Sequence, residues 1–226
     1  MKRILLLNFL IILGLSSNSN AQPTEVFNKK GYQLTFENQD ANFSPELKNK
    51  LVETFYTVYP KLAKAYNKKT LKSVIFVIDT AYNGVAATDN GRVVFSSKYM
   101  TKHPHDIDVV THEVMHIVQD YGSNNNGPGW LTEGIADYAR YKFGVDNEGA
   151  KWALPAFKAT QSYENSYRIT ARFLVWIEKN IKPGLVKNLD AQLRNHTFTN
   201  DSWKKETGKT LDELWAAYAA NPVIAA

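Results

Sequence analysis

The sequence predicts an α+β fold, because the segments expected to be strands come early in the chain and most of those expected to be helices come later. Residues 32–36 alternate apolar and polar side chains and residues 73–78 form a β-branched run, so both are expected to be strands. From residue 106 onward, apolar residues recur at spacings of three and four, which is typical of amphipathic helices. No repeat or linker-like stretch is visible, so residues 22–226 are expected to form a single domain.

The N-terminus has the form of an export signal. Met1-Lys2-Arg3 supplies positive charge, residues 4–15 are apolar, and small and polar residues lead to Ala21. The apolar run is shorter than the roughly 20 residues that a membrane-spanning helix needs. We therefore expect a signal peptide over residues 1–21 and a secreted or periplasmic protein that is not stably inserted in a membrane. An uncleaved anchor is the alternative.

The composition limits the chemistry that the chain can perform. There is no cysteine, which excludes a disulfide framework, a thiolate metal site and a cysteine nucleophile. The formal net charge is +5, but the lysines are scattered rather than arranged in a stripe, so nucleic-acid binding is not expected. Any metal must therefore be held by histidines and carboxylates. The protein is expected to be a monomer.

Two further elements are expected in the first half of the chain. Ser44-Pro45 is typical of a helix N-terminus, and Pro60 is expected to kink or divide the helix that follows. Asn90-Gly91 predicts a tight turn into a strand over residues 92–96. We hypothesise that residues 93–97 form an edge strand along a cleft, to which an extended peptide can add. An ordinary internal strand is the alternative.

Residues 106–121 are expected to form a helix that carries the sequence H-E-x-x-H. Residues four apart lie on one face of a helix, so His112 and His116 would point their imidazoles at a common point and supply half of a tetrahedral zinc site. Glu113 would lie beside the metal, where it can take a proton from bound water and pass it to a leaving group. This pattern is the metalloprotease signature, and the alternative is an ordinary amphipathic helix.

The residues just before this helix have less specific roles. Asp106 or Asp108 is expected to cap its N-terminus. His103 and His105 lie beside a proline in the preceding loop and are expected to be solvated rather than to bind metal.

A second helix, expected over residues 130–141, supplies candidates for the third ligand. Glu133 and Asp137 are four residues apart and share a face. One carboxylate can complete a zinc site and leave the fourth position to water, while the other can accept the free N–H of a ligating imidazole. A third histidine is absent, since Gln119 and Gly122 occupy the glycine and histidine positions of the three-histidine motif.

The C-terminal part is expected to be helical over residues 162–180, 184–195 and 211–220. The last helix begins with the capping box Thr210-Leu211-Asp212-Glu213. The segment 144–161 is expected to be irregular, with Trp152, Pro155 and Phe157 as candidate cleft or packing residues.

Three stretches together resemble the basic secretory protein family of plants and bacteria: T-H-E-V-M-H-I-V-Q at 111–119, G-W-L-T-E-G-I-A-D-Y at 129–138 and Y-R-I-T-A-R-F-L-V-W-I-E at 167–178. Residues 84–88 and 211–215 add to the likeness, which covers about residues 26–218. The family is regarded as zinc-dependent peptidases of the H-E-x-x-H type. The resemblance implies a zincin-like fold, with a small twisted mixed sheet, the zinc helix and a mainly helical C-terminal part.

Carried over by position, the resemblance makes His112 and His116 zinc ligands and Glu113 the general base. It favours Glu133 over Asp137 as the third ligand, and Asp137 is then expected to accept a hydrogen bond from His112. Zincins often supply a tyrosine or histidine to stabilise the oxyanion, and Tyr167 heads the helix after the cleft segment, so Tyr167 is the candidate donor. Tyr163 and His196 are the alternatives to Tyr167.

The function expected from these residues is that of an exported Zn²⁺-dependent peptidase acting on peptide or protein substrates. One alternative is an exported binding or defence protein with a non-catalytic zinc site, although structural zinc sites usually have four protein ligands. Another is a zinc amidase that acts on cell-wall peptides by the same chemistry.

Overall fold

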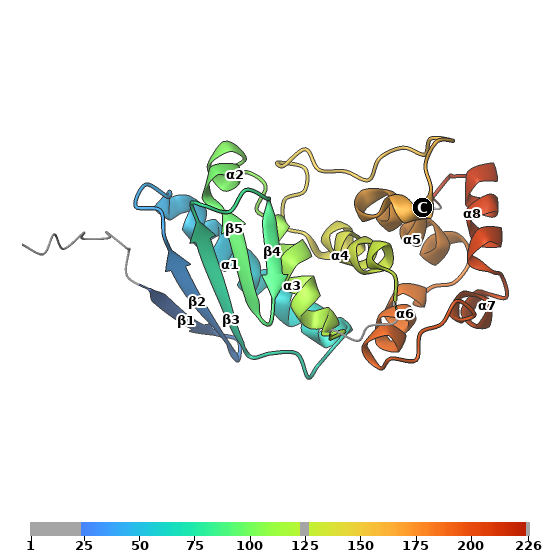
Figure 1. Ribbon diagram of the computed structural model, residues 1–226, viewed down its shortest axis with the longest axis horizontal. Coiled ribbons are helices and arrows are strands. Elements are labelled where there is room, and N and C mark those ends of the chain that lie inside the picture. The colour runs from blue at the N-terminus through green and yellow to red at the C-terminus, as the bar shows by residue number, and fades with distance from the viewer. Residues whose placement is uncertain (1–23, 123–126, 225–226) are drawn as a thin grey trace, which may run out of the picture.

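A sheet from the first half of the chain, with helix α1 (Pro45–Ala65) packed on it, and a mainly helical second half make up the α+β fold that the sequence predicts (Figure 1). The computed structural model describes residues 24–122 and 127–224, so the signal peptide predicted at 1–21 lies outside the described residues. Within these ranges no helix is both long enough and apolar enough to cross a membrane.

The sheet has five strands in the order β1-β2-β3-β5-β4 and is mixed, as predicted. The neighbours β2–β3 and β3–β5 are parallel, whereas β1–β2 and β5–β4 are antiparallel. The strands are β1 (Glu25–Lys29), β2 (Tyr32–Asn38), β3 (Ser73–Asp79), β4 (Ala86–Asp89) and β5 (Arg92–Ser96).

The hypothesis that residues 93–97 form the edge strand is wrong, because β5 is paired on both sides. Asn90 and Gly91, both with positive φ, make the predicted turn and fold β4 back onto the outer side of β5. The edge beside the cleft is therefore β4, a four-residue strand with a mixed apolar and polar sequence that gives little signal of its own.

Helix α1 (Pro45–Ala65) packs on the sheet through aromatic rings. Phe55 of α1 meets Phe76 of β3 edge to face at 5.5 Å, and Phe76 meets Phe95 of β5 at 5.0 Å. Ser44 caps α1 by accepting a hydrogen bond from the Leu47 N–H, as predicted. The helix continues through Pro60 and is not divided.

Two helices in the middle of the chain carry the predicted ligands: α3 (Val109–Gln119), which follows the short α2 (Ser97–Lys102), and α4 (Gly129–Phe143). Asp108 is the residue at the N-cap position of α3, but its carboxylate makes no capping hydrogen bond. It accepts instead from the Thr111 hydroxyl and from the backbone N–H groups of Val145 and Asp146. The predicted side-chain cap is therefore wrong, because Asp108 joins the start of α3 to the loop after α4.

The C-terminal helices are α5 (Tyr167–Asn180), α6 (Leu185–Arg194), α7 (Ser202–Thr207) and α8 (Leu211–Ala220). The predicted capping box at the start of α8 is confirmed, but α5 begins at Tyr167 after a single 3₁₀ turn, Tyr163–Asn165. Helices α4 and α5 approach closely at Gly134, where an added Cβ would lie 2.3 Å from the Thr170 Cγ2.

Arg194 of α6 ties the C-terminal part to the ends of two earlier helices. Its guanidinium donates to the carbonyls of Val118 and Gln119 at the end of α3, and to that of Tyr66 after α1. It also pairs with the fully buried Asp190 at 2.7 Å. The carbonyls at a helix C-terminus lack partners within the helix, so Arg194 satisfies part of that need for α3.

Candidate metal centre

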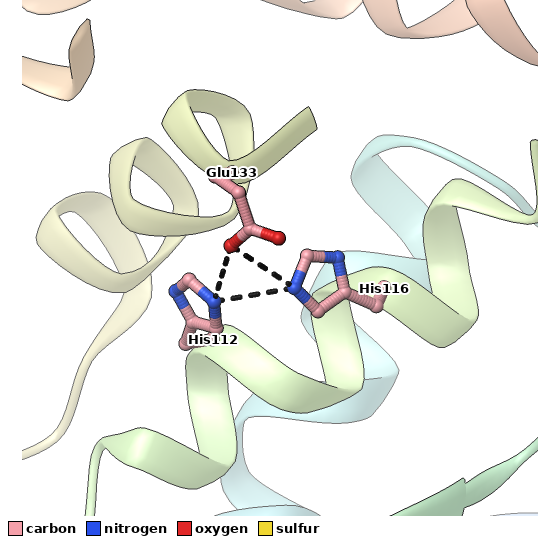
Figure 2. A group of neighbouring side chains, drawn as sticks. All are labelled: His112, His116 and Glu133. Carbon is pink, nitrogen blue, oxygen red and sulfur yellow. Dashed lines mark hydrogen bonds and ion pairs between the residues drawn. The ribbon is translucent and has the colours of Figure 1, made fainter. Parts of the chain in front are cut away.

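Three side chains predicted as ligands meet in one place. His112 and His116 project from one face of α3, and Glu133 points toward them from α4 (Figure 2). The two Nε2 atoms lie 3.2 Å apart, and the Glu133 Oε2 lies 3.2 Å from the His112 Nε2 and 3.6 Å from the His116 Nε2. These three atoms form a nearly equilateral triangle.

The far side of each imidazole is occupied by an acceptor. The Nδ1–H of His112 donates to the Asp137 Oδ1 at 2.7 Å, and the Nδ1–H of His116 donates to the Gln119 Oε1 at 2.7 Å. The orientation of the Gln119 amide follows from its Nε2, which donates to the Thr132 carbonyl at 2.9 Å. Both imidazoles, when neutral, therefore turn an Nε2 lone pair toward the centre.

This donor set fits a zinc ion. With Zn–N and Zn–O bonds of about 2.0–2.1 Å at tetrahedral angles, ligand atoms lie roughly 3.3–3.4 Å apart, close to the three separations observed. When both rings are neutral, their two lone pairs and the carboxylate oxygen can share one cation. Three protein ligands leave a fourth tetrahedral position open, as in catalytic rather than structural zinc sites.

The electrostatics of the site also favour a cation. Burial acts to lower the pKa of His112, but its hydrogen bonds to Asp137 and Glu133 and the nearby negative charges outweigh burial and raise that pKa to about 10. Burial likewise acts to raise the pKa of Glu133, but hydrogen bonds to His112 and His116 lower it to about 2. Glu133 is thus ionised over the whole neutral range.

Glu113 lies beside the three predicted ligands and is hydrogen-bonded to the edge strand. Its side chain is buried and lines the same cleft as His112 and His116. The Thr88 hydroxyl of β4 lies 2.6 Å from the Glu113 Oε2 and 3.1 Å from the Glu113 carbonyl oxygen. Thr88 therefore connects the edge of the sheet to the carboxylate that the sequence predicts to be the general base.

All six predicted site residues line one cleft of about 1710 Å³, and Tyr167 is among them. The Tyr167 ring is stacked on that of His112, with 6.1 Å between centroids, and its side chain is half exposed to the cleft. The negative charge of Glu133 and partial burial raise the pKa of Tyr167, so its hydroxyl stays protonated and can donate. Tyr167 has a φ of 49° and the preceding Ser166 a φ of 66°, both in the left-handed region.

The two alternatives to Tyr167 lie elsewhere. The Tyr163 hydroxyl donates to Asp212 at 2.9 Å, and its ring packs on Trp130. His196 is exposed after α6, and the predicted loop histidines His103 and His105 are exposed as well.

Sequence reasoning missed two residues of this site. Thr88 had no signal, because nothing local marks its strand as the edge that faces Glu113. Gln119 lies three residues after His116, on the same helix face, so helical spacing gave a signal for its contact with that predicted ligand.

The chain is similar in sequence to a known family of peptidases. The sequence pattern of a family described as "Peptidase of plants and bacteria" matches residues 15–218. No curated protein matches the chain.

Two solved structures are similar in fold. Legionella pneumophila aminopeptidase A, solved in complex with aspartic acid, has a TM-score of 0.53 at 15% identity, covering 87% of this chain and 28% of that one. An aminopeptidase N family protein from Idiomarina loihiensis has a TM-score of 0.50 at 11% identity, covering 90% of this chain and 45% of that one. The chain thus spans less than half of either protein, and the likeness is one of fold. The zincin-like fold implied by the sequence resemblance is confirmed.

Proposed function

The chain belongs to the basic secretory protein family of plant and bacterial peptidases, and on that basis we propose that it is an exported, zinc-dependent peptidase. The observation that carries the proposal is the triangle of Nε2, Nε2 and Oε2 atoms on His112, His116 and Glu133. Its size suits zinc, and its three ligands leave a position for water. Zinc bound there supplies a Lewis acid that makes water nucleophilic near neutral pH and polarises the scissile carbonyl.

Glu113 is the proposed general base. Its Oε2 is engaged by the Thr88 hydroxyl, so Oε1 is the oxygen that takes a proton from the attacking water. The same carboxyl group then delivers that proton to the nitrogen of the leaving amine. Thr88 fixes the rotation of the carboxylate, so that no reorientation is needed between the two transfers.

Tyr167 is the proposed oxyanion donor. It lines the cleft with the ligands, and its hydroxyl stays protonated because the charge of Glu133 raises its pKa. Its O–H can donate to the carbonyl oxygen of the substrate as negative charge develops there. Asp137 and Gln119 hold the imidazoles in the tautomer that leaves both Nε2 atoms free.

Export is proposed from the N-terminal sequence. The charged start, the apolar run of residues 4–15 and the small residues before Ala21 have the form of a cleavable signal. A mature protein recovered from the periplasm or medium should begin at Gln22, and full-length protein retained in the cytoplasm would contradict export.

Glu113→Gln provides the sharpest test of the mechanism. The variant should keep stoichiometric zinc and lose a factor of about 10² to 10⁴ in cleavage rate on a peptide library. A chelator should abolish cleavage by the wild type, and added zinc should restore it. Full activity of Glu113→Gln would contradict the proposed role of Glu113 as general base. Zinc retention without cleavage of any peptide by the wild type would favour the binding-protein alternative.

A further inference from the structure

The end of the cleft nearest the start of α3 is basic. Arg140, which pairs with Asp106 just before α3, lines it together with Trp152 on its guanidinium and the neighbouring Lys151 and Arg168. We propose that this end binds a carboxylate of the substrate, which makes the protein selective for peptides that carry an acidic group on one side of the scissile bond. This inference rests on the proposed peptidase function and names the class of peptide that it acts on.

Arg140 is held in place by contacts to its Nε, its Nη2 and one face of its guanidinium. It is 4% exposed, its Nη2 pairs with Asp106, and its Nε donates to the Asn147 Oδ1 at 3.1 Å. The Trp152 ring covers the guanidinium at 4.6 Å. Asp106 is itself fixed by the Tyr99 hydroxyl at 2.6 Å. A guanidinium immobilised in this way loses little entropy when it binds a ligand.

One nitrogen of this guanidinium is left for a ligand. Within residues 24–122 and 127–224, no acceptor pairs with the Arg140 Nη1. That nitrogen is not sealed inside the protein, since Arg172 Nε is the sole buried side-chain nitrogen or oxygen without a partner in those ranges. Arg140 lines the cleft, and Nη1 is the guanidinium nitrogen that remains available to a substrate there. A carboxylate is the acceptor that a guanidinium binds best.

Two exposed cations reinforce the charge at this end. Lys151 precedes Trp152 directly, and Arg168 donates to the neighbouring Ala153 carbonyl at 3.4 Å. Neither forms an ion pair with any residue that the structure describes. Asp106 is already paired with Arg140, so the basic end keeps a net positive charge.

The opposite end of the cleft has no lysine or arginine among its described lining residues. It is lined by Asp120 and Gly122, which follow the last turn of α3. The two ends are separated by the length of α3, about 15 Å at a rise of 1.5 Å per residue. A peptide that lies along the cleft therefore meets positive charge at one end only.

The spacing along α4 estimates where the acidic group lies on the substrate. Arg140 follows Glu133 by two turns on the same helix, and the corresponding axial distance is about 10.5 Å. An extended peptide advances about 3.3–3.6 Å per residue, so the bound carboxylate belongs to a residue about two or three positions from the scissile carbonyl. It comes either from an acidic side chain or from a chain terminus, and both present the same chemistry.

Matched peptides test the proposal. A neutral peptide with one cleaved bond is varied to Glu or Gln at each of the three positions on either side. Glu should be preferred over Gln at one position by about 10- to 100-fold in kcat/KM, as expected for a charge-assisted hydrogen bond. A second series, ended at those positions by a free acid or an amide, tells a terminal carboxylate from a side chain. A Glu to Gln ratio near one everywhere, with no preference for the free acid, overturns the proposal.

Variants assign the preference to this end of the cleft. Lys151→Gln combined with Arg168→Gln should reduce it, and Arg140→Lys, which keeps the charge but loses Nη1, should reduce it further. Lys158→Gln is the matched control, because this exposed lysine in the same segment lies outside the cleft lining. An unchanged preference in all cleft variants overturns the assignment.

Binding separates this proposal from that of peptidase activity. The affinity of the Glu and Gln peptides for the Glu113→Gln variant can be followed by tryptophan fluorescence without turnover. Tighter binding of the acidic peptide supports the carboxylate site even if the wild type cleaves nothing, and equal binding counts against it even if cleavage is observed.

Discussion

Replacing Gln119 should weaken metal binding without touching a ligand. Gln119 is 1% exposed, accepts from the His116 Nδ1–H at 2.7 Å and donates to the Thr132 carbonyl at 2.9 Å. One amide thus orients a ligand on α3 and joins α3 to the turn of α4 that precedes Glu133. In Gln119→Leu, a side chain of similar size, both hydrogen bonds are lost.

The size of the effect follows from these two bonds. A buried group left without its partner costs about 1–3 kcal/mol. Both His116 and Thr132 are partly exposed, so water can compensate in part, and a total loss of about 2–4 kcal/mol in unfolding free energy is expected. Loss of a hydrogen bond that orients a metal-bound histidine typically lowers metal affinity by about 10- to 100-fold.

Two measurements on two variants separate these effects. Zinc affinity is measured by competition with a chromophoric chelator, and stability by denaturant unfolding of the metal-free protein. Gln119→Glu can still accept from His116 but cannot donate to Thr132, so it should lose stability while keeping more of the zinc affinity than Gln119→Leu. Wild-type zinc affinity in Gln119→Leu would refute the role assigned to Gln119.

Four further outcomes are expected. Adding zinc to metal-free protein should raise the unfolding free energy by about 2.7 kcal/mol at a hundredfold excess over Kd, and calcium should not, as calorimetry can check. Tyr167→Phe should lower kcat by about 10²-fold or more with little change in KM or zinc content; an unchanged kcat would exclude Tyr167 as the donor. Arg194→Met should cost about 3–5 kcal/mol at pH 7, because it leaves the buried Asp190 charge without its cationic partner. Burial raises the pKa of Asp190 even with Arg194 present, so the neutral carboxyl favours folding, and this stability is lost as pH rises through the folded-state pKa. The variant raises that pKa further. Denaturant unfolding should therefore show a smaller loss of unfolding free energy, relative to the wild type, at pH 5 than at pH 7. Gly134→Ala should cost about 1–3 kcal/mol through its contact with Thr170 and lower the zinc content, and adding Thr170→Ser, which removes the contacting methyl, should restore part of both.

The sequence predicts best those parts of the fold and site that depend on local spacing. His112, Glu113 and His116 share a helix, and four-residue periodicity alone places the two imidazoles together. Ser44 and the capping box at Thr210 are likewise local signals, since a cap needs only the next three residues.

The parts that sequence reasoning missed depend on contacts between distant segments. Thr88 reaches Glu113 across 25 positions, and β4 becomes the edge only because β5 inserts next to β3. Asp108 has a typical cap residue type and position, but the loop after α4 offers two backbone N–H groups that compete for its carboxylate. The sequence around Arg140 is that of a charged residue on a helix, and its burial depends on Asp106, a partner from a distant part of the chain.

The backbone conformation of Ser166, at the start of α5, costs stability and positions Tyr167 in the cleft. Ser166 has a φ of 66° with a ψ of −179°, a conformation that is almost restricted to glycine and costs about 1–3 kcal/mol in other residues. Glycine at this position would remove that cost and would also give the backbone that carries Tyr167 more conformational freedom. Selection for heat resistance alone should therefore favour Ser166→Gly, and selection for turnover should reverse it.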